Sequence, residues 1–221
     1  MRPLTDQTPK PLLQIAGKAL IEYHLERLAE AGFNEIIINH AWLGQQIEET
    51  LEDGASYGLS IRYSAEAEAL ETAGGIIKAL PMLGTAPFLL VNGDIWTDYP
   101  FSRLREKSAM QELAHLVLVD NPPQHPQGDY HLQEDKRVCV RQSEGGGGGK
   151  KALTYSGIAV IHPQLLDGIE AGKLALAPVW EALMPDGRIT GEYYTGQWFD
   201  IGTVERLQQL EAQLLANAQQ A

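Results

Sequence analysis

The chain has 221 residues, of which 44% are hydrophobic, and this suits one globular domain with a substantial core. Its formal net charge of −12 argues against a nucleic-acid or anionic-membrane binder, because such proteins present a basic face. The single cysteine, Cys139, excludes an internal disulfide, and no apolar run approaches the roughly 18 residues of a membrane span. Since the first residues do not resemble a secretory signal either, we expect a cytoplasmic protein.

Helical and strand patterns alternate over the first half of the chain. Apolar residues recur at helical spacing from Leu20 to Leu28, and Gly32 follows at the position of a C-terminal cap. Further helices are predicted at 42–52 and 72–80, and strands at 35–39, 59–63, 88–91 and 116–119, most of them buried. This alternation predicts βαβ units and a parallel sheet covered on both faces.

The second half is richer in strand patterns and contains a glycine run. A hairpin is predicted at 129–142, and Gly145 to Gly149, followed by Lys150 and Lys151, predicts a flexible loop. The later elements are a strand at 152–161, helices near 163–171 and 177–184, strands near 188–199 and a final helix from Thr203. No linker is evident, so we expect a single α/β domain over 1–221 with a small β-rich insertion.

Pro9-Lys10-Pro11 contains the first candidate for a functional residue. Two prolines restrict the backbone around one lysine, so its ammonium group points in a set direction. Such a lysine can neutralise phosphate oxygens as charge develops in a displacement. The motif by itself fits an ordinary surface turn better, and only the motifs that follow shift the interpretation towards a catalytic Lys10.

Asp94 is the second candidate. It follows the strand predicted at 88–91 and is preceded by Asn92 and Gly93, so its carboxylate is expected at the carboxyl edge of a parallel sheet. Mg²⁺ in proteins is commonly held by one or two carboxylates together with substrate phosphates. A turn without function explains Gly93-Asp94 equally well.

Asp200 is the third candidate, and it precedes Gly202-Thr203 at the start of the last predicted helix. Thr203 suits an N-cap, with Arg206 at the position where a capping box would have Glu or Gln. Capping explains Thr203 and leaves Asp200 without a local role. If Asp200 folds back near Asp94, the two form a two-carboxylate metal site, and the sequence leaves open whether it does.

Two further segments contain small residues that would let a ligand approach the backbone. Glu66 precedes Gly74 and Gly75, and small residues before a predicted helix expose N–H groups to a base or a phosphate. Ser156 and Gly157 interrupt a predicted strand, which indicates a bulge or a close approach. A turn and a bulge without function are equally consistent with these patterns. The histidines show no zinc spacing, so we predict no structural metal.

Together these motifs resemble those of the sugar-1-phosphate nucleotidyltransferases. Residues 1–13 match the second half of the family signature, and the motifs at 66–76, 92–94, 154–157 and 198–203 follow in the family's order and spacing. The resemblance implies a Rossmann-like three-layer α/β sandwich with a mostly parallel mixed sheet. It also implies a direct transfer in which a sugar 1-phosphate attacks a nucleoside triphosphate, with Mg²⁺ as cofactor and pyrophosphate as product.

A narrower resemblance, carried by 36–46, 70–75 and 91–96, is to uridylyltransferases of bacterial cell-wall (peptidoglycan) sugar recycling. It implies UTP and N-acetylmuramate 1-phosphate as substrates. The alternative is a guanylyl- or thymidylyltransferase for a hexose 1-phosphate. By position, Lys10 would contact phosphate oxygens, and Asp94 and Asp200 would hold Mg²⁺. The nucleotide would be bound by Glu66, Gly74 and Gly75, and the sugar by Asn92, Asp129, Ser156 and Gly157.

Two departures from the family pattern qualify this expectation. The family's first strand, glycine loop and arginine would precede Met1, so we expect that segment to be missing and the chain to be catalytically impaired. An inactive sugar-nucleotide-binding module is therefore an alternative. The Glu-Lys-Pro motif of many members is replaced by the glycine run and Lys150-Lys151, so the group that binds the sugar phosphate stays open, as does the number of subunits.

Overall fold

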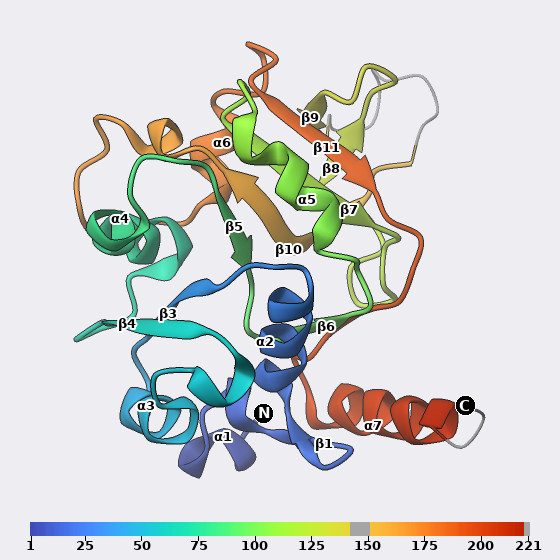
Figure 1. The fold of residues 1–221 in the computed structure, drawn as a ribbon. Helices are drawn as coiled ribbons and strands as arrows, with labels where there is room; N and C mark the ends of the chain where they lie inside the picture. Colours follow the sequence, from blue (N-terminus) through green and yellow to red (C-terminus); the bar gives the residue numbers. More distant parts are fainter. Residues whose placement is uncertain (142–150, 219–221) are drawn as a thin grey trace. The chain divides into compact units, whose positions relative to one another are not determined.

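The computed structural model describes residues 1–141 and 151–218, which form two compact units (Figure 1). Unit 1 comprises Met1–Ala69, Asn92–Ser102 and Gln197–Ala221, and unit 2 comprises Leu70–Val91 and Arg103–Gly196. The chain passes between the units several times, and none of these passages has the composition of a linker. The single-domain organisation stays a prediction, and the glycine run at 145–149 lies outside the described residues.

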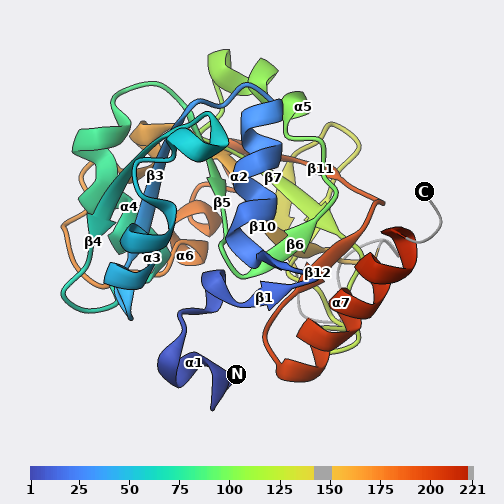
Figure 2. The same ribbon diagram turned by 60° about the horizontal axis from the view of Figure 1, so that its bottom comes forward.

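Unit 1 contains one parallel and two antiparallel pairs of strands together with four α-helices. β3 pairs with β4 in parallel, whereas β1 pairs with β2 and β12 pairs with β6 in antiparallel fashion. Helix α7 lies beside β1 and β12 (Figure 2). The elements are α1 (Leu4–Gln7), η1 (Lys10–Leu12), β1 (Gln14–Ile15), β2 (Lys18–Ala19), α2 (Leu20–Glu30), β3 (Glu35–His40), α3 (Gly44–Leu51), η2 (Ala55–Tyr57), β4 (Ser60–Ala65), β6 (Ile95–Thr97), β12 (Trp198–Asp200) and α7 (Val204–Ala218).

The predicted helix α2 forms as its pattern indicates. Its first turn is closed by the Glu22 carboxylate, which accepts the backbone N–H of Ala19 at 2.6 Å. Its apolar face, which includes Leu20 and Leu25, is buried. Gly32 has φ of +79°, the left-handed conformation that glycine adopts after a helix.

Unit 2 is built on a four-stranded sheet. Its elements are α4 (Glu71–Leu83), β5 (Phe88–Val91), η3 (Glu106–Ala109), β7 (Ala114–Val119), β8 (Tyr130–Leu132), β9 (Val138–Val140), β10 (Thr154–Ile161), η4 (Pro163–Leu166), α6 (Ala177–Glu181) and β11 (Ile189–Tyr193), with α5 (Ser102–Arg105) at its boundary. The strand order is β11-β7-β10-β5, as Figure 1 shows. The sheet is mixed, as expected, but the expectation of mostly parallel pairing is wrong for it, because only β11–β7 is parallel. The hairpin predicted at 129–142 is confirmed as β8–β9.

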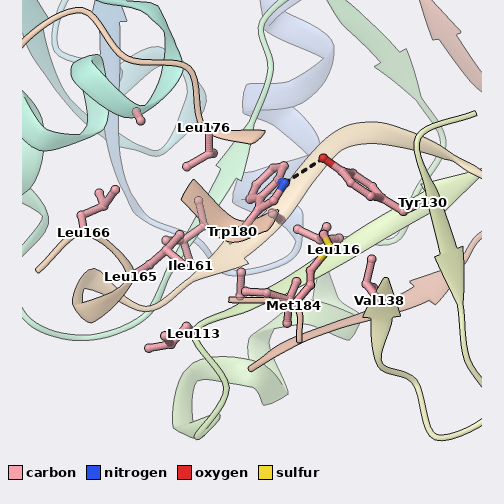
Figure 3. Close-up of a cluster of buried hydrophobic side chains, with 14 of the residues drawn as sticks. Leu113, Leu116, Tyr130, Val138, Ile161, Leu165, Leu166, Leu176, Trp180 and Met184 are labelled. Carbon is pink, nitrogen blue, oxygen red and sulfur yellow. Dashed lines mark hydrogen bonds between the residues drawn. The ribbon is translucent and has the colours of Figure 1, made fainter. Parts of the chain in front are cut away.

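The core of unit 2 surrounds Trp180 (Figure 3). The indole N–H of Trp180 donates to the Tyr130 hydroxyl at 2.9 Å, and this hydroxyl donates to Glu181 at 2.9 Å. Burial raises the pKa of Tyr130, so the hydroxyl keeps its proton and both hydrogen bonds persist. Apolar packing therefore holds α6 in the core of unit 2, and the satisfied polar contacts join it to Tyr130 of β8.

Two strands that were predicted as buried are only half-buried. All six residues of β7 are buried, whereas every residue of β5 and the three isoleucines of β3 keep intermediate exposure. Among the described residues, β3 is hydrogen-bonded only to β4, and β5 only to β10. One edge of each strand is thus unpaired, and the burial predicted from apolar composition is wrong because it depends on neighbours on both sides. No helix in the described ranges combines the length and apolar character that crossing a membrane requires.

Candidate active site

Lys10 is presented by a short turn whose backbone is closed by its own hydrogen bonds. Leu12 donates to the Pro9 carbonyl at 2.9 Å, and Leu13 donates to the Lys10 carbonyl at 3.1 Å. The side chain of Lys10 is 29% exposed, and its Nζ lies 3.0 Å from Oδ2 of Asp94. Two of the residues selected from the sequence are therefore in direct contact.

Asp94 is brought to the site by antiparallel pairing. It lies in the turn between β5 and β6, and β6 pairs with β12 so that Asp200 stands opposite Ile95. The backbone N–H of Ile201 donates to the Asp94 carbonyl at 2.9 Å. The expectation that Asp94 ends a strand of a parallel sheet is wrong, since β5 runs antiparallel to β10, its neighbour among the described residues. The segments that carry Asp94 and Asp200 nevertheless lie side by side.

Asp200 also has a cationic partner. Nη1 of Arg206 contacts Oδ2 of Asp200, and the two side chains are 23% and 36% exposed. Arg206 lies in the first turn of α7, whose N-cap is Thr203, with the Arg206 backbone N–H 3.3 Å from the Thr203 hydroxyl. The predicted cap is confirmed.

The Mg²⁺ site predicted at Asp94 and Asp200 has suitable donor atoms and stays a prediction. Carboxylate oxygens suit this hard cation, and the contacts with Lys10 and Arg206 engage Oδ2 of Asp94 and Asp200. Within the part of the chain that the structure describes, no group of three or more His, Cys, Asp or Glu side chains could hold a metal ion. Any Mg²⁺ here would therefore need phosphate oxygens and water as further ligands, as is usual for nucleotide-dependent enzymes.

A buried histidine supports the strand beside Asp94. Nε2 of His24 lies 2.7 Å from the Ile95 carbonyl, so this nitrogen carries the proton when the ring is neutral. Burial lowers the pKa of His24 to about 4, and the hydrogen bond to Ile95 and the nearby Asp94 only partly oppose it. His24 is therefore neutral at physiological pH and acts here as a hydrogen-bond donor.

A cavity of about 460 Å³ opens next to Lys10. Its walls include Gly202, His40 at the end of β3, and Trp42 from the connection between β3 and α3. Although the Trp42 side chain is 64% exposed, its indole N–H donates to the Thr5 carbonyl at 3.0 Å. The cavity is large enough for the polyphosphate part of a nucleotide, and Lys10 supplies a cation on its wall.

The residues expected at the nucleotide are divided between the units. Glu66 lies in unit 1, where its backbone N–H donates to the His40 carbonyl at 2.8 Å. Gly74 and Gly75 lie in unit 2, buried inside α4, which contains the helix predicted at 72–80, so the expectation that they form an exposed turn before that helix is wrong. A Cβ on Gly74 would lie 2.1 Å from the Gly172 carbonyl oxygen, so close packing of the 172–174 segment accounts for this glycine. Nucleotide binding by these residues stays a prediction.

The residues expected at the sugar are also divided. Asn92 lies in unit 1, and the other three lie in unit 2. Asp129 accepts from His125 and from the Tyr155 backbone N–H, both at 2.8 Å. Ser156 is fully buried and donates to the Val117 carbonyl at 2.7 Å.

Gly157 has φ of +82° where the pairing of β10 with β7 shifts register. The predicted bulge is thus present, and Ser156 and Gly157 both serve to build it. Sugar binding by Asn92, Asp129, Ser156 and Gly157 stays a prediction.

Two residues near the site have roles that sequence reasoning did not find. Arg206 was noticed only as an unusual residue for a capping box, and His24 only as a member of an apolar helix face. The available signal for Arg206 was a cation within the first turn of a helix, close to a carboxylate. The available signal for His24 was a histidine among the leucines of an apolar helix face. Neither signal identifies a partner, because both partners lie on β6 or β12 and are set by tertiary pairing.

Comparison with known proteins gives the decisive observation. The Nucleotidyl transferase family matches residues 1–138. The chain is 55% identical to N-acetylmuramate alpha-1-phosphate uridylyltransferase of Neisseria meningitidis serogroup B, over 99% of this chain and 94% of that protein. This chain belongs to the Nucleotidyl transferase family.

More distant relatives agree with this assignment. The chain is 31% identical to N-acetylmuramate alpha-1-phosphate uridylyltransferase of Caulobacter vibrioides, over 97% of this chain and 91% of that protein. It is 28% identical to the catalytic subunit beta of mannose-1-phosphate guanylyltransferase of Drosophila melanogaster, over 91% of this chain and 56% of that protein. The relatives are thus sugar-1-phosphate nucleotidyltransferases, and the chain is an enzyme of this type.

Solved structures show the same fold. A Bacillus anthracis protein named as a candidate glucose-1-phosphate thymidylyltransferase superposes with a TM-score of 0.83 at 18% identity, covering 96% of this chain and 89% of the other. HddC from Yersinia pseudotuberculosis superposes with a TM-score of 0.74 at 21% identity, covering 94% and 90%. The predicted nucleotidyltransferase-type α/β fold is therefore confirmed.

Proposed function

We propose that the chain transfers the uridylyl group of UTP to N-acetylmuramate 1-phosphate, giving UDP-N-acetylmuramate and pyrophosphate. The observation that carries the proposal is the 55% identity to the Neisseria uridylyltransferase over nearly the whole chain. The same proposal assigns the reaction to the recycling of cell-wall sugars in the cytoplasm. The net charge of −12 argues against a nucleic-acid substrate and agrees with a small-molecule enzyme.

The chemistry that the site supports is an in-line displacement without a covalent enzyme intermediate. A phosphate oxygen of the sugar 1-phosphate attacks the α-phosphorus of UTP, a new P–O bond forms, and the bond to the leaving pyrophosphate breaks. Positioning and charge stabilisation supply the catalysis in such reactions. The prearranged charges of unit 1 suit this role.

Lys10 would bind phosphate oxygens from the wall of the cavity. In the structure its ammonium contacts Asp94, and an incoming triphosphate offers it oxygens that carry more negative charge. Asp94 and Asp200 would hold Mg²⁺, which supplies positive charge to the triphosphate and to the leaving group when bound. Glu66 would accept the N3–H of uracil, and this role distinguishes a uracil base from bases that lack that donor.

The experiment is a nucleotide and sugar matrix. Pyrophosphate release is measured for UTP, GTP and dTTP, each with N-acetylmuramate 1-phosphate, mannose 1-phosphate and glucose 1-phosphate. We expect turnover with UTP and N-acetylmuramate 1-phosphate to exceed every other combination. Preferred use of GTP with mannose 1-phosphate would contradict the proposal and favour the guanylyltransferase alternative, which the 28% identical relatives suggest. Binding of UDP-N-acetylmuramate without any turnover would favour the inactive binding module.

A further inference from the structure

Arg206 occupies a position that helix formation does not explain. It lies in the first turn of α7, where the partial positive charge of the helix N-terminus disfavours a cation. A capping box would place Glu or Gln there, and the cap itself is supplied by Thr203. A second interaction must therefore account for the arginine.

That interaction is with Asp200. The guanidinium reaches back across Gly202 and donates to Oδ2 of the carboxylate. A Cβ on Gly202 would lie 2.3 Å from Nη2 of Arg206, so the glycine leaves the space through which the arginine passes. The Arg206 side chain is only 23% exposed, so the contact is shielded from solvent more than a surface ion pair is.

The Arg206–Asp200 contact has a counterpart at the other carboxylate. Lys10 contacts Oδ2 of Asp94 in the same way, and the two aspartates lie on segments joined by the Ile201–Asp94 backbone hydrogen bond of 2.9 Å. Each carboxylate therefore has its own cation. Lys10 lines the cavity, whereas Arg206 is not among the residues that line it, and the Arg206 backbone N–H donates to the Thr203 hydroxyl.

We propose that Arg206 is a positioning residue for Asp200. It fixes the orientation of the carboxylate through Oδ2 and so presents the other oxygen to the Mg²⁺ that the proposed function requires. The inference rests on that function. It predicts the opposite change in metal affinity to the one that charge repulsion between Arg206 and Mg²⁺ would give. If Arg206 only competed with the cation, its removal would tighten metal binding; if it orients Asp200, its removal weakens metal binding.

The test uses Mn²⁺ as a paramagnetic probe for the metal, in the full chain with UTP and without sugar phosphate. Free Mn²⁺ is measured by electron paramagnetic resonance for the wild type, Arg206→Gln and Asp200→Asn. The control is Gln208→Met, an exposed residue of the same helix. We expect Mn²⁺ to bind on the order of 10-fold more weakly to Arg206→Gln, and with wild-type affinity to the control. Unchanged or tighter binding to Arg206→Gln would overturn the inference.

Two further measurements keep the outcome interpretable. If circular dichroism shows that Arg206→Gln fails to fold, the variant Arg206→Lys replaces it. This variant keeps the positive charge but loses the planar guanidinium group, so it should bind Mn²⁺ more weakly than the wild type. Wild-type affinity of Arg206→Lys for Mn²⁺ would then overturn the inference. In a pyrophosphate assay, excess Mg²⁺ should restore most of the turnover of Arg206→Gln. A wild type that takes up no Mn²⁺ beyond the amount that UTP alone binds would count against the proposed function itself. Weakened binding in Asp200→Asn alone would count only against the role of Arg206.

Discussion

The backbone N–H of Ile201 donates to the carbonyl of Asp94 at 2.9 Å, and this hydrogen bond joins the two segments that carry the acidic residues of the candidate site. It extends the antiparallel pairing of β12 with β6, and Ile95 and Ile201 on the two segments are both buried. Asp94 and Asp200 thus lie on backbone segments that are hydrogen-bonded to each other, and this limits how far the two residues can separate.

Removing either carboxylate should impair turnover. For Asp94→Asn and for Asp200→Asn we expect losses on the order of 10²-fold or more in kcat, because a ligand of a charge-stabilising cation is lost. Steady-state pyrophosphate release at saturating UTP and Mg²⁺ measures the effect. Asp53→Asn is the control, because the Asp53 side chain accepts the backbone N–H of Ala55 in a local turn. Near-normal turnover in either variant would show that the two do not share an ion.

Lys10 should contribute more to the transition state than to substrate binding. We expect Lys10→Met to lower kcat more than it raises KM for UTP, since charge builds up on the phosphate oxygens during the displacement. The control is Lys18→Met, which removes a lysine of similar exposure from an ion pair with Glu26. Unchanged kcat with a raised KM would assign Lys10 to ground-state binding instead.

Lowering the pH from 6.5 to 4 should destabilise the fold, because over this range His24 binds a proton in the unfolded chain only. Its pKa is about 4 when folded against an ordinary 6.5, so above pH 6.5 the ring is neutral in both states. Between pH 6.5 and 4 only the unfolded state binds the proton, and about 3 kcal/mol of stability is lost over this range.

Urea unfolding at several pH values measures this slope for the wild type and for His24→Gln. The variant should lose less stability than the wild type between pH 6.5 and 4. Identical slopes in the wild type and His24→Gln would mean that His24 is protonated in the folded state at a higher pH than its burial implies.

Gly74 should tolerate no side chain. In Gly74→Ala the new Cβ would lie 2.1 Å from the Gly172 carbonyl oxygen, and the segment that accepts hydrogen bonds from Ala73 and Gly74 would have to move. We expect a net loss of about 2 kcal/mol, after the better helix propensity of alanine, about 1 kcal/mol, is subtracted. Thermal unfolding measures the loss. Gly172→Ala meets no atom within 4 Å and should leave Tm nearly unchanged.

The open edge of β3 should promote self-association. Ile36 and Ile38 pack on the unit 1 core, so a charge at Ile37 should weaken edge pairing at little cost to the fold. We expect light scattering to show concentration-dependent association of the wild type and less of it for Ile37→Lys. Gln45→Lys adds the same charge on α3 and should behave as the wild type. A monomeric wild type over the whole concentration range would refute this role of the edge.

Local sequence patterns identified several elements and the chemical candidates. Helix α2 and its glycine cap, the hairpin at β8–β9 and the cap at Thr203 follow from spacing and neighbouring residues, which act within a few positions of the chain. Lys10, which lies between two prolines, and the two aspartates were also identified from their neighbours in the sequence. Family resemblance then connected them to one reaction.

Tertiary structure alone decided which of these residues meet. The contacts of Lys10 with Asp94 and of Arg206 with Asp200, and the β6–β12 pairing beneath them, depend on how segments distant in sequence pair. Composition could not predict that β3 and β5 would stay half-buried. Burial and pairing are properties of the neighbours that a strand acquires on folding, and a local pattern does not specify those neighbours.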